Sequence, residues 1–269
     1  MQPMANMALK AARLAGKHIA RAFDRPDTIR ISEKGPNDFV TNIDTEAEQI
    51  IIESLKTAYP THSFIGEENM AESVNAPTDD KADFQWIIDP IDGTANFVRG
   101  IPHFCISIAC MHKGRLEHGV ILDPLRLEEF VASRGHGCSL NGRRVRVRPL
   151  KDLNGAMCST GGRENGEVSS QQGSVYGHLL SQGVIMRQAG SAALDLAYVA
   201  AGRLDAMWMR QLNIWDMAAG ALMVQEAGGI LGDFDGSANH LKTGDIIAAS
   251  PKVFKFIAPV IKKGYKNAT

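Results

Sequence analysis

The sequence predicts an α+β fold, because pairs of amphipathic helices are interspersed with short strands that favour antiparallel sheets. Residues 4–23 and about 43–58 repeat apolar side chains at helical spacing. From residue 84 onward, short apolar segments follow one another around turn residues such as Asp123-Pro124, as in a meander. The 269 residues show no internal repeat and no low-complexity linker. We therefore expect one domain over 1–269, with subregions of about 1–150 and 151–269.

The first half is predicted to begin with two helices and to continue with strands. Pro26 ends the first helix and Pro60 the second, because proline has no amide hydrogen to continue a helix. The polar stretch 34–36 is predicted to be a loop or a loose hairpin, and the acidic stretch 72–83 a surface loop. Strands are predicted at 63–65, 84–88, 104–111, 117–122, 127–132 and 144–148.

The second half mixes helices with short strands. Helical patterns cover about 168–181, 191–201 and 215–227, and a last helix is predicted to begin at Pro251. Strands are predicted near 156–160, 205–209 and 246–249.

Composition excludes some classes of protein. Hydrophobic residues make up 44% and charged residues 22%, as in an ordinary globular protein. The formal net charge of −1 gives no global field that would recruit nucleic acid or an anionic membrane. The four cysteines form no C-x-x-C pair and are expected to be reduced core residues. No segment reaches the ~18 apolar residues of a membrane span and no leader pattern is present, so a cytoplasmic protein without membrane contact is expected.

The most informative pattern is Trp-Ile-Ile-Asp-Pro-Ile-Asp-Gly-Thr-Ala-Asn-Phe at 86–97. A buried strand delivers Asp89, and Asp92 precedes Gly93 and Thr94, where a helix is predicted to start. The free N–H groups of a helix start favour phosphate. Two carboxylates beside phosphate would repel it unless divalent cations lay between them, and hard oxygen ligands indicate Mg²⁺ rather than zinc. The alternative is that both aspartates only cap a helix and brace a turn.

Further acidic residues stand at the ends of predicted elements. Glu67 and Glu68 follow the strand at 63–65, Asp44 lies where the second helix begins, and Asp216 opens a helix rich in small residues. Each alone is typical of a helix cap or a solvated carboxylate. Together with Asp89 and Asp92 they are enough for a site that holds two metal ions.

These segments resemble the motifs of the inositol monophosphatase family. The sequence at 86–97 and Trp-Asp-Met-Ala-Ala-Gly-Ala-Leu-Met-Val-Gln-Glu-Ala-Gly-Gly from 215 are similar to its two signatures. Gly-Glu-Glu at 66–68 and Asp-Phe-Val-Thr-Asn-Ile-Asp at 38–44 fit two earlier motifs. The four occur in the family's order, the likeness covers essentially the whole chain, and it is greatest to the bacterial extragenic-suppressor (SuhB-like) branch.

The resemblance implies a layered α-β-α-β-α sandwich, usually dimeric, with Mg²⁺ activation and lithium sensitivity. It implies two or three Mg²⁺ ions in each site. Glu67, Asp89 and the carbonyl of Ile91 correspond to ligands of the first ion, and Asp89, Asp92 and Asp216 to ligands of the second. A further, weakly held ion near Glu67 is common in the family.

The resemblance also implies the remaining roles. Gly93 and Thr94 would bind phosphate through backbone N–H groups, and the Thr94 hydroxyl, held by Asp44, would orient a metal-activated water. Ala192 corresponds to a backbone contact with substrate. The implied reaction is hydrolysis of inositol 1-phosphate or a similar small polyol or sugar monophosphate.

The chain departs from the family pattern at Met209, where inositol-selective members carry a glutamate. A thioether is a poor acceptor for ring hydroxyls, so weaker selectivity for inositol is predicted. The alternative is that the alignment slips and Arg210 or Gln211 supplies the contact.

Other functions remain open. Related phosphatases act on fructose 1,6-bisphosphate, phosphonucleotides or histidinol phosphate, and the sequence does not separate these. Bacterial relatives are also associated with the transcription machinery, so a regulatory binding protein is a second class. The basic residues Arg143, Arg144, Arg146, Arg148 and Lys151 could bind RNA or a partner, or could simply solvate a strand.

Overall fold

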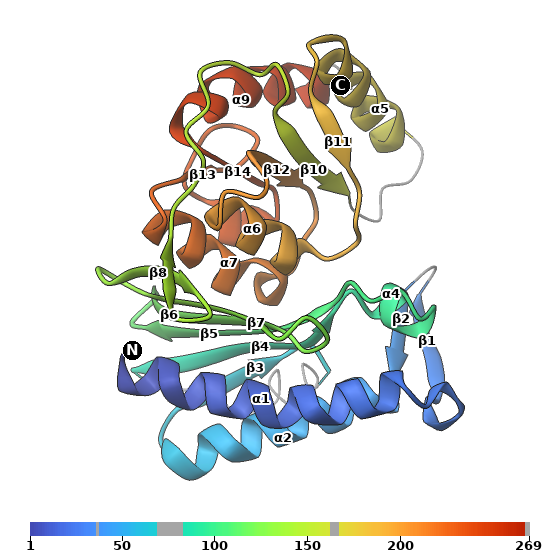
Figure 1. Cartoon of the computed structure of the whole chain (residues 1–269), viewed down its shortest axis with the longest axis vertical. Helices are drawn as coiled ribbons and strands as arrows, with labels where there is room; N and C mark the ends of the chain where they lie inside the picture. The colour runs from blue at the N-terminus through green and yellow to red at the C-terminus, as the bar shows by residue number, and fades with distance from the viewer. Residues whose placement is uncertain (36–37, 69–82, 162–166, 267–269) are drawn as a thin grey trace.

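The computed structural model describes residues 1–35, 38–68, 83–161 and 167–266. The surface loop predicted at 72–83 lies, apart from residue 83, outside the described residues. Two helices, α1 (Pro3–Phe23) and α2 (Asn42–Ala58), form the first layer (Figure 1). They are joined by the short helix η1 (Pro26–Thr28) and the antiparallel hairpin of β1 (Ile31–Gly35) and β2 (Asp38–Thr41). Both predicted helices are confirmed, and the stretch around residue 35 is a hairpin.

A seven-stranded sheet lies on these helices, in the order β3-β4-β5-β6-β7-β8-β9. The β3–β4 pair is parallel and the other pairs are antiparallel, which confirms the predicted meander. The strands are β3 (Ser63–Gly66), β4 (Phe84–Asp92), β5 (Cys105–His112), β6 (Arg115–Asp123), β7 (Glu128–Ser133), β8 (Gly137–Leu140) and β9 (Arg143–Val145). The short helix α4 (Thr94–Val98) follows β4.

The other face of this sheet carries α6 (Ala192–Ala200) and α7 (Ile214–Glu226), as Figure 1 shows. Most residues of both helices are buried, because a second sheet covers them. That sheet has the order β11-β10-β12-β14-β13. Its strands are β10 (Met157–Gly161), β11 (Ile185–Arg187), β12 (Ala206–Met209), β13 (Ile230–Gly232) and β14 (Ile246–Ala249).

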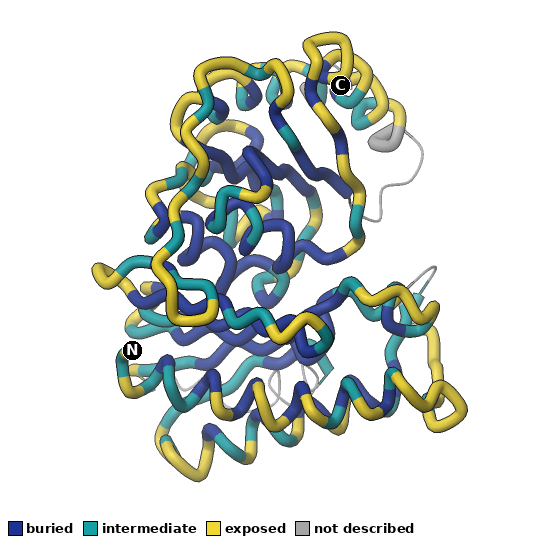
Figure 2. The backbone as a smooth tube through the Cα atoms, viewed as in Figure 1, coloured by how far each residue is buried: buried dark blue, intermediate teal, exposed yellow. Residues whose placement is uncertain are grey.

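The outer layer consists of α5 (Glu167–Ser181) and α9 (Pro251–Lys266), and α8 (His240–Thr243) precedes β14. The layers therefore follow the α-β-α-β-α order, with buried residues concentrated between them (Figure 2). Three hydrophobic clusters fill the spaces between the layers: one between α1, α2 and the first sheet, one around α6 and α7 between the two sheets, and one between the second sheet and α5 and α9. All four cysteines are buried and free, as predicted. Among the described residues, no helix is long and apolar enough to cross a membrane.

Two strand predictions were wrong in extent, and three short strands were not predicted. The strand predicted at 84–88 continues to Asp92, because β5 pairs with it beyond the expected end. The strand predicted at 144–148 has only the residues of β9, which pair with β8, and the chain then leaves the sheet. The short strands β8, β11 and β13 were not predicted, since three or four residues show too little periodicity.

Candidate active site

The C-terminal end of strand β4 presents two carboxylates. Asp89 is paired with Ser107 of β5 and Asp92 with Cys105, with an irregularity in the register between them. Pro90 lies in this irregularity, where a strand tolerates a missing N–H group. The N–H of Ile91 donates to Asp89 Oδ1 at 3.0 Å, which fixes the carboxylate against its own backbone. Asp89 is 1% exposed and Asp92 9% exposed.

The third carboxylate comes from the start of α7. Asp216 stands in the first turn of that helix and accepts a hydrogen bond from the Asn213 N–H at 2.7 Å through Oδ2. Side-chain oxygens of Asp89, Asp92 and Asp216 lie within 4.8 Å of one another. Residues more than 120 positions apart thus meet at one point, as the distance from Asp92 to Asp216 in the sequence shows.

Glu67 directly follows β3, which runs parallel to β4. Its N–H donates to the carbonyl of Ile88 at 3.2 Å, so Glu67 lies beside the residue that precedes Asp89. The group of three aspartates does not include Glu67. Its charge nevertheless acts on Asp89 more strongly than that of any other neighbouring carboxylate.

The electrostatics of Asp89 indicate that the site is built for a cation. Burial raises the pKa of Asp89 well above its usual range, and the charges of Glu67, Asp92, Asp216 and Asp44 raise it further. These four charges are all negative. A buried cluster of this kind is costly unless positive charge is bound within it. The donor atoms are carboxylate oxygens, which fit Mg²⁺.

Asp92 is held by the beginning of α6. The Ser191 hydroxyl and the Ala193 N–H each donate to Asp92 Oδ2 at 2.6 Å, and the Cys105 thiol lies 3.9 Å away. Burial raises the pKa of Asp92, while the hydrogen bonds from Ser191, Ala193 and Ala192 lower it. With Oδ2 occupied in this way, Oδ1 remains for another ligand.

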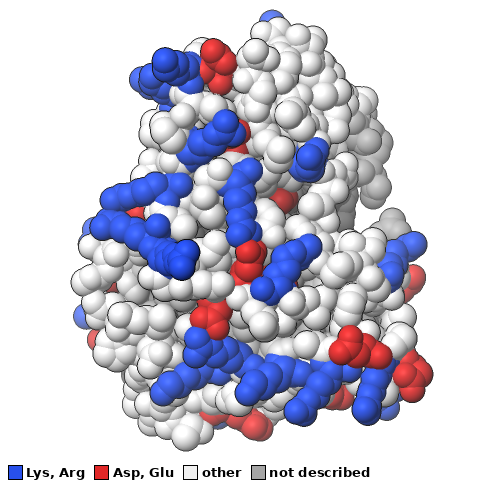
Figure 3. All heavy atoms as spheres, in the orientation of Figure 1, with Lys and Arg blue, Asp and Glu red and all other residues white. Residues whose placement is uncertain are grey.

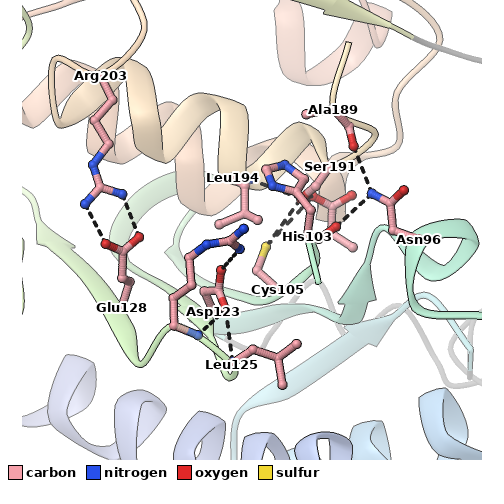
Figure 4. A network of polar contacts seen from close by, with 12 residues as sticks. Asn96, His103, Cys105, Asp123, Leu125, Glu128, Ala189, Ser191, Leu194 and Arg203 are labelled. Atoms are coloured by element: carbon pink, nitrogen blue, oxygen red, sulfur yellow. Dashed lines mark hydrogen bonds and ion pairs between the residues drawn. The ribbon is translucent and has the colours of Figure 1, made fainter. Parts of the chain in front are cut away.

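The segment that precedes α6 also contacts α4 and β5, as Figure 4 shows. The Asn96 side-chain amide donates to the carbonyls of His103 and Ala189, both at 2.8 Å. Ser191 and Cys105 lie next to each other, with 3.7 Å between Oγ and Sγ. The segment before α6 is therefore tied to both α4 and β5.

Thr94 connects this corner to α2. Its hydroxyl lies 3.3 Å from Asp44 Oδ1 and 2.9 Å from the carbonyl of Ile91, two acceptors for one proton. Asp44 Oδ2 accepts from the N–H and the hydroxyl of Thr41, at 2.8 and 2.5 Å. Burial raises the pKa of Asp44 to about 6. Asp44 is thus a fixed acceptor that can orient the Thr94 hydroxyl.

Gly93 separates β4 from α4 in a left-handed conformation, with φ of 101°. A Cβ at this position would lie 3.1 Å from the His103 carbonyl oxygen and 3.2 Å from that of Gly190. Only glycine fits both constraints easily. The tight turn leaves the backbone N–H groups of Gly93 and Thr94 next to the aspartate cluster.

Met209, where the family pattern has a glutamate, is the last residue of β12. Met209 is 4% exposed and belongs to the hydrophobic cluster that includes Ala192 and Trp215. The Nε of the next residue, Arg210, lies 3.4 Å from Asp245 Oδ2, and its guanidinium lies over Phe234 and Tyr265.

Gln211 follows with φ of 54°, and its N–H donates to Asp245 Oδ1. Asp245 and two aromatic rings contact the Arg210 side chain, and the alternative that Arg210 or Gln211 contacts substrate stays a prediction.

Sequence reasoning missed Ser191 and Ala193. The sequence did place Ser191 at the start of a predicted helix, where a serine side chain commonly caps the helix by hydrogen bonding. Nothing in the sequence indicated that this cap would meet Asp92. The side chains of Lys34 and Asp38, both near the predicted motif, lie outside the described atoms.

Comparisons with known proteins agree with the family that the residue pattern resembles. A model of the inositol monophosphatase family matches residues 1–264. The Nus factor SuhB of Pseudomonas aeruginosa is 51% identical over 266 residues, covering 97% of this chain and 97% of that protein. The Nus factor SuhB of Escherichia coli K12 is 46% identical, covering 95% of this chain and 94% of that protein.

Solved structures show the same architecture. The extragenic suppressor protein suhB from Bartonella henselae has a TM-score of 0.89 at 36% identity, covering 96% of this chain and 98% of that chain. An IMPase from Thermotoga maritima has a TM-score of 0.86 at 32% identity, covering 97% of each chain. The family model spans nearly the whole chain and the relatives cover almost all of it, so this chain belongs to the inositol monophosphatase family.

Proposed function

We propose that the chain is a Mg²⁺-dependent phosphomonoesterase that hydrolyses inositol 1-phosphate or a similar small polyol or sugar monophosphate. The observation that carries this proposal is the convergence of Asp89, Asp92 and Asp216 within 4.8 Å. Carboxylates placed so closely favour a bound cation, and a cation beside the backbone N–H groups at the start of α4 would attract a phosphate dianion.

The proposed ligands follow the geometry and the family pattern. Glu67, Asp89 and the Ile91 carbonyl would hold one ion, and Asp89, Asp92 and Asp216 a second, with a third held weakly near Glu67. When bound, Mg²⁺ supplies charge that neutralises the phosphate and lowers the pKa of water.

The chain's own residues would do the rest of the work. The N–H groups of Gly93 and Thr94 would bind phosphate oxygens, and the backbone of Ala192 would contact the alcohol. The Thr94 hydroxyl, with Asp44 and the Ile91 carbonyl as acceptors, would orient the attacking water and accept its hydrogen bond. The α6 cap on Asp92 would keep the carboxylate from rotating during turnover.

The test is phosphate release from inositol 1-phosphate with Mg²⁺, with a chelator, and with the Asp89→Asn variant. Activity should require Mg²⁺, fall by ~10³-fold or more in Asp89→Asn, and be inhibited by lithium. The exposed Asp27→Asn variant is the matched control. Glycerol 2-phosphate, a nucleotide monophosphate, fructose 1,6-bisphosphate and histidinol phosphate would define the substrate class. Turnover of none of these would defeat the proposal.

We also propose a second, compatible role, binding to the transcription machinery as a homodimer. Its support is the name Nus factor SuhB carried by relatives up to 51% identical. Asp89→Asn should spare such binding, whereas neutralising Arg143, Arg144, Arg146 and Arg148 should weaken it and leave hydrolysis intact. Pull-down of RNA polymerase subunits and light scattering of the free protein would measure partner and dimer. A monomer that retains no transcription protein would contradict this role.

A further inference from the structure

Helix α1 carries an unusual distribution of charge. Its 21 residues contain Lys10, Arg13, Lys17 and Arg21 but no aspartate or glutamate. All four cationic side chains are exposed. The spacing places Arg13, Lys17 and Arg21 four residues apart, where like charges on a helix repel one another. The row therefore disfavours the helix on which it stands, and helix stability does not explain it.

The surroundings neutralise only part of this row. Arg13 forms two hydrogen bonds with the Glu129 carboxylate, at 2.6 and 2.7 Å, and His18 lies 2.8 Å from Glu46. Within the described part of the chain, Lys10, Lys17 and Arg21 form no ion pair. A line of unneutralised charge thus runs along α1, although the whole chain has a net charge of only −1.

Figure 3 shows Lys and Arg side chains gathered along α1 and continuing over the middle of the same face. The arginines near β9 have an ordinary structural explanation. β9 is the last strand of its sheet, and cationic side chains on an edge strand hinder pairing with another molecule. No such explanation applies to α1, which is a helix and already packs its apolar face on the sheet.

The chemistry of the row selects one kind of partner. From Lys10 to Arg21 the helix rises about 16 Å, with a cation on nearly every turn. A repeating polyanion matches a repeating row of cations. Leu14 is the large apolar side chain that α1 exposes in this row, at 52%, and no aromatic ring accompanies it. The surface therefore lacks the stacking platforms that bind bases.

We propose that the exposed face of α1, formed by Lys10, Arg13, Lys17 and Arg21, binds the phosphate backbone of a nucleic acid without reading its sequence. A membrane surface fits less well, because the apolar face of α1 is already buried against the sheet and cannot enter lipid. The residues of this surface do not distinguish RNA from DNA, so the experiment compares probes of both kinds. The inference does not rest on the proposed hydrolysis.

The test is fluorescence anisotropy with labelled probes of about 20 units: single-stranded RNA, an RNA duplex and a DNA duplex. The variant is Lys10→Glu/Lys17→Glu/Arg21→Glu. The matched control is Lys252→Glu/Lys255→Glu/Lys263→Glu, which changes the net charge equally on exposed positions of α9. That helix lies at the far end of the molecule from α1 (Figure 1). Circular dichroism would verify that both variants fold.

Wild-type protein should bind at least one probe with an affinity that falls steeply between roughly 50 and 200 mM salt. The α1 variant should lose about tenfold or more in affinity, and its slope of log K against log salt should flatten by about 2 to 3. The α9 control and Asp89→Asn should bind like the wild type. The probe that binds most tightly shows whether α1 prefers the phosphate backbone of RNA or that of DNA.

Three results would overturn the proposal. The first is a wild-type protein that binds no probe at 50 mM salt, and the second is an α9 control that loses as much affinity as the α1 variant. The third is tighter binding of poly-glutamate or anionic vesicles than of any nucleic acid. Because the readout is binding, loss of phosphatase activity alone would leave the outcome unchanged.

Discussion

At the residue scale, Met209 stands where the family pattern has a glutamate that contacts substrate. Its side chain is buried in the hydrophobic cluster that includes Ala192 and Trp215 and offers no strong hydrogen-bond acceptor. The neighbouring Arg210 is engaged by Asp245 and two aromatic rings. Hydroxyl groups of a ring are therefore expected to find few partners at this position.

We expect Met209→Glu to raise the preference for inositol 1-phosphate. A carboxylate at this position would accept hydrogen bonds from ring hydroxyls, and such contacts discriminate strongly between substrates. The ratio of kcat/KM for inositol 1-phosphate to that for glycerol 2-phosphate should rise about tenfold, or ~1.4 kcal/mol. Met209→Leu, which keeps the rim apolar, should leave the ratio near its wild-type value. An unchanged ratio in both variants would show that Met209 does not contact the alcohol.

Asp195 is expected to make stability depend on pH. It is 1% exposed, accepts the Ser159 hydroxyl at 2.6 Å, and has its pKa raised by burial to about 7. Between pH ~4 and ~7 the unfolded chain loses this proton while the folded chain keeps it. The folded state then binds more protons, so stability falls as pH rises through this window and levels off above it.

The measurement is urea unfolding of wild type and Asp195→Asn at pH 5 and pH 8, both in chelator. Asparagine keeps an acceptor for Ser159 but does not ionise. Relative to wild type, Asp195→Asn should therefore be more stable at pH 8 than at pH 5, by on the order of a few kcal/mol. Ser159→Ala, which removes the donor and leaves Asp195 ionisable, should retain the wild-type trend. Parallel pH profiles for wild type and Asp195→Asn would contradict this assignment.

Which residues could be found from sequence depends on how local their chemistry is. Asp89 and Asp92 were identified because a strand, a proline and a helix start lie within one short segment. Ser191 was missed because its partner, Asp92, is 99 positions away and the contact depends on how two layers pack. Met209 was noticed through the family pattern, but only the structure shows where Arg210 points.

At the element scale, α6 and α7 approach so closely that one position between them must lack a side chain. A Cβ on Gly220 of α7 would lie 2.4 Å from the Leu196 Cβ of α6. The close approach lets α6 hold Asp92 while α7 presents Asp216. The separation of these two helices therefore sets the position of two carboxylates at once.

We expect Gly220→Ala to destabilise the protein by about 1–3 kcal/mol, because the added methyl group has no space. The matched control is Gly177→Ala in α5, where a Cβ would meet nothing within 4 Å. That change should stabilise the protein by about 0.5–1 kcal/mol, since alanine favours an exposed helix. Urea unfolding monitored by circular dichroism measures both. Equal effects of the two substitutions would show that α6 can move away from α7 without cost.

Long periodic elements were predictable and short ones were not. The helices α1, α2 and α7 begin and end close to their predicted limits, and α9 begins at Pro251 as predicted, because prolines and helical patterns mark them. β11 and β13 have three residues each and owe their conformation to their neighbours in the sheet. β9 ends earlier than its alternating sequence predicted, because Val147 bonds to Ala227 rather than to β8.

At the scale of the whole molecule, α7 connects the two subregions. It contacts β4, β5, β6 and β7 of the seven-stranded sheet on one side and β13 and β14 of the other sheet on the other. A bidentate pair between Arg203 and Glu128 adds a second link between the layers (Figure 4). We propose that residues 1–269 fold as a single domain. The order of the layers was predicted from the family resemblance. Local sequence patterns could not predict it, because it depends on pairing between distant segments.

The proposed metal site is expected to act on global stability, because its carboxylates come from both sides of an interlayer contact. In chelator, Asp89 is a buried carboxylate among other negative charges, and burial and repulsion raise its pKa. Asp89→Asn removes that repulsion and keeps an oxygen that can accept the Ile91 N–H. We expect the variant to be more stable than wild type under these conditions, by on the order of 1 kcal/mol at pH 8.

Added Mg²⁺ should reverse this order. At 100 times its Kd, a ligand that binds only the folded state stabilises it by about 2.7 kcal/mol, and wild type should gain this while Asp89→Asn gains little. Asp27→Asn, on the exposed helix η1, should behave as wild type with and without the ion. Thermal unfolding of the three proteins across a Mg²⁺ titration measures the crossing. If Mg²⁺ stabilised Asp89→Asn as much as wild type, the carboxylates of β4 and α7 would not share an ion.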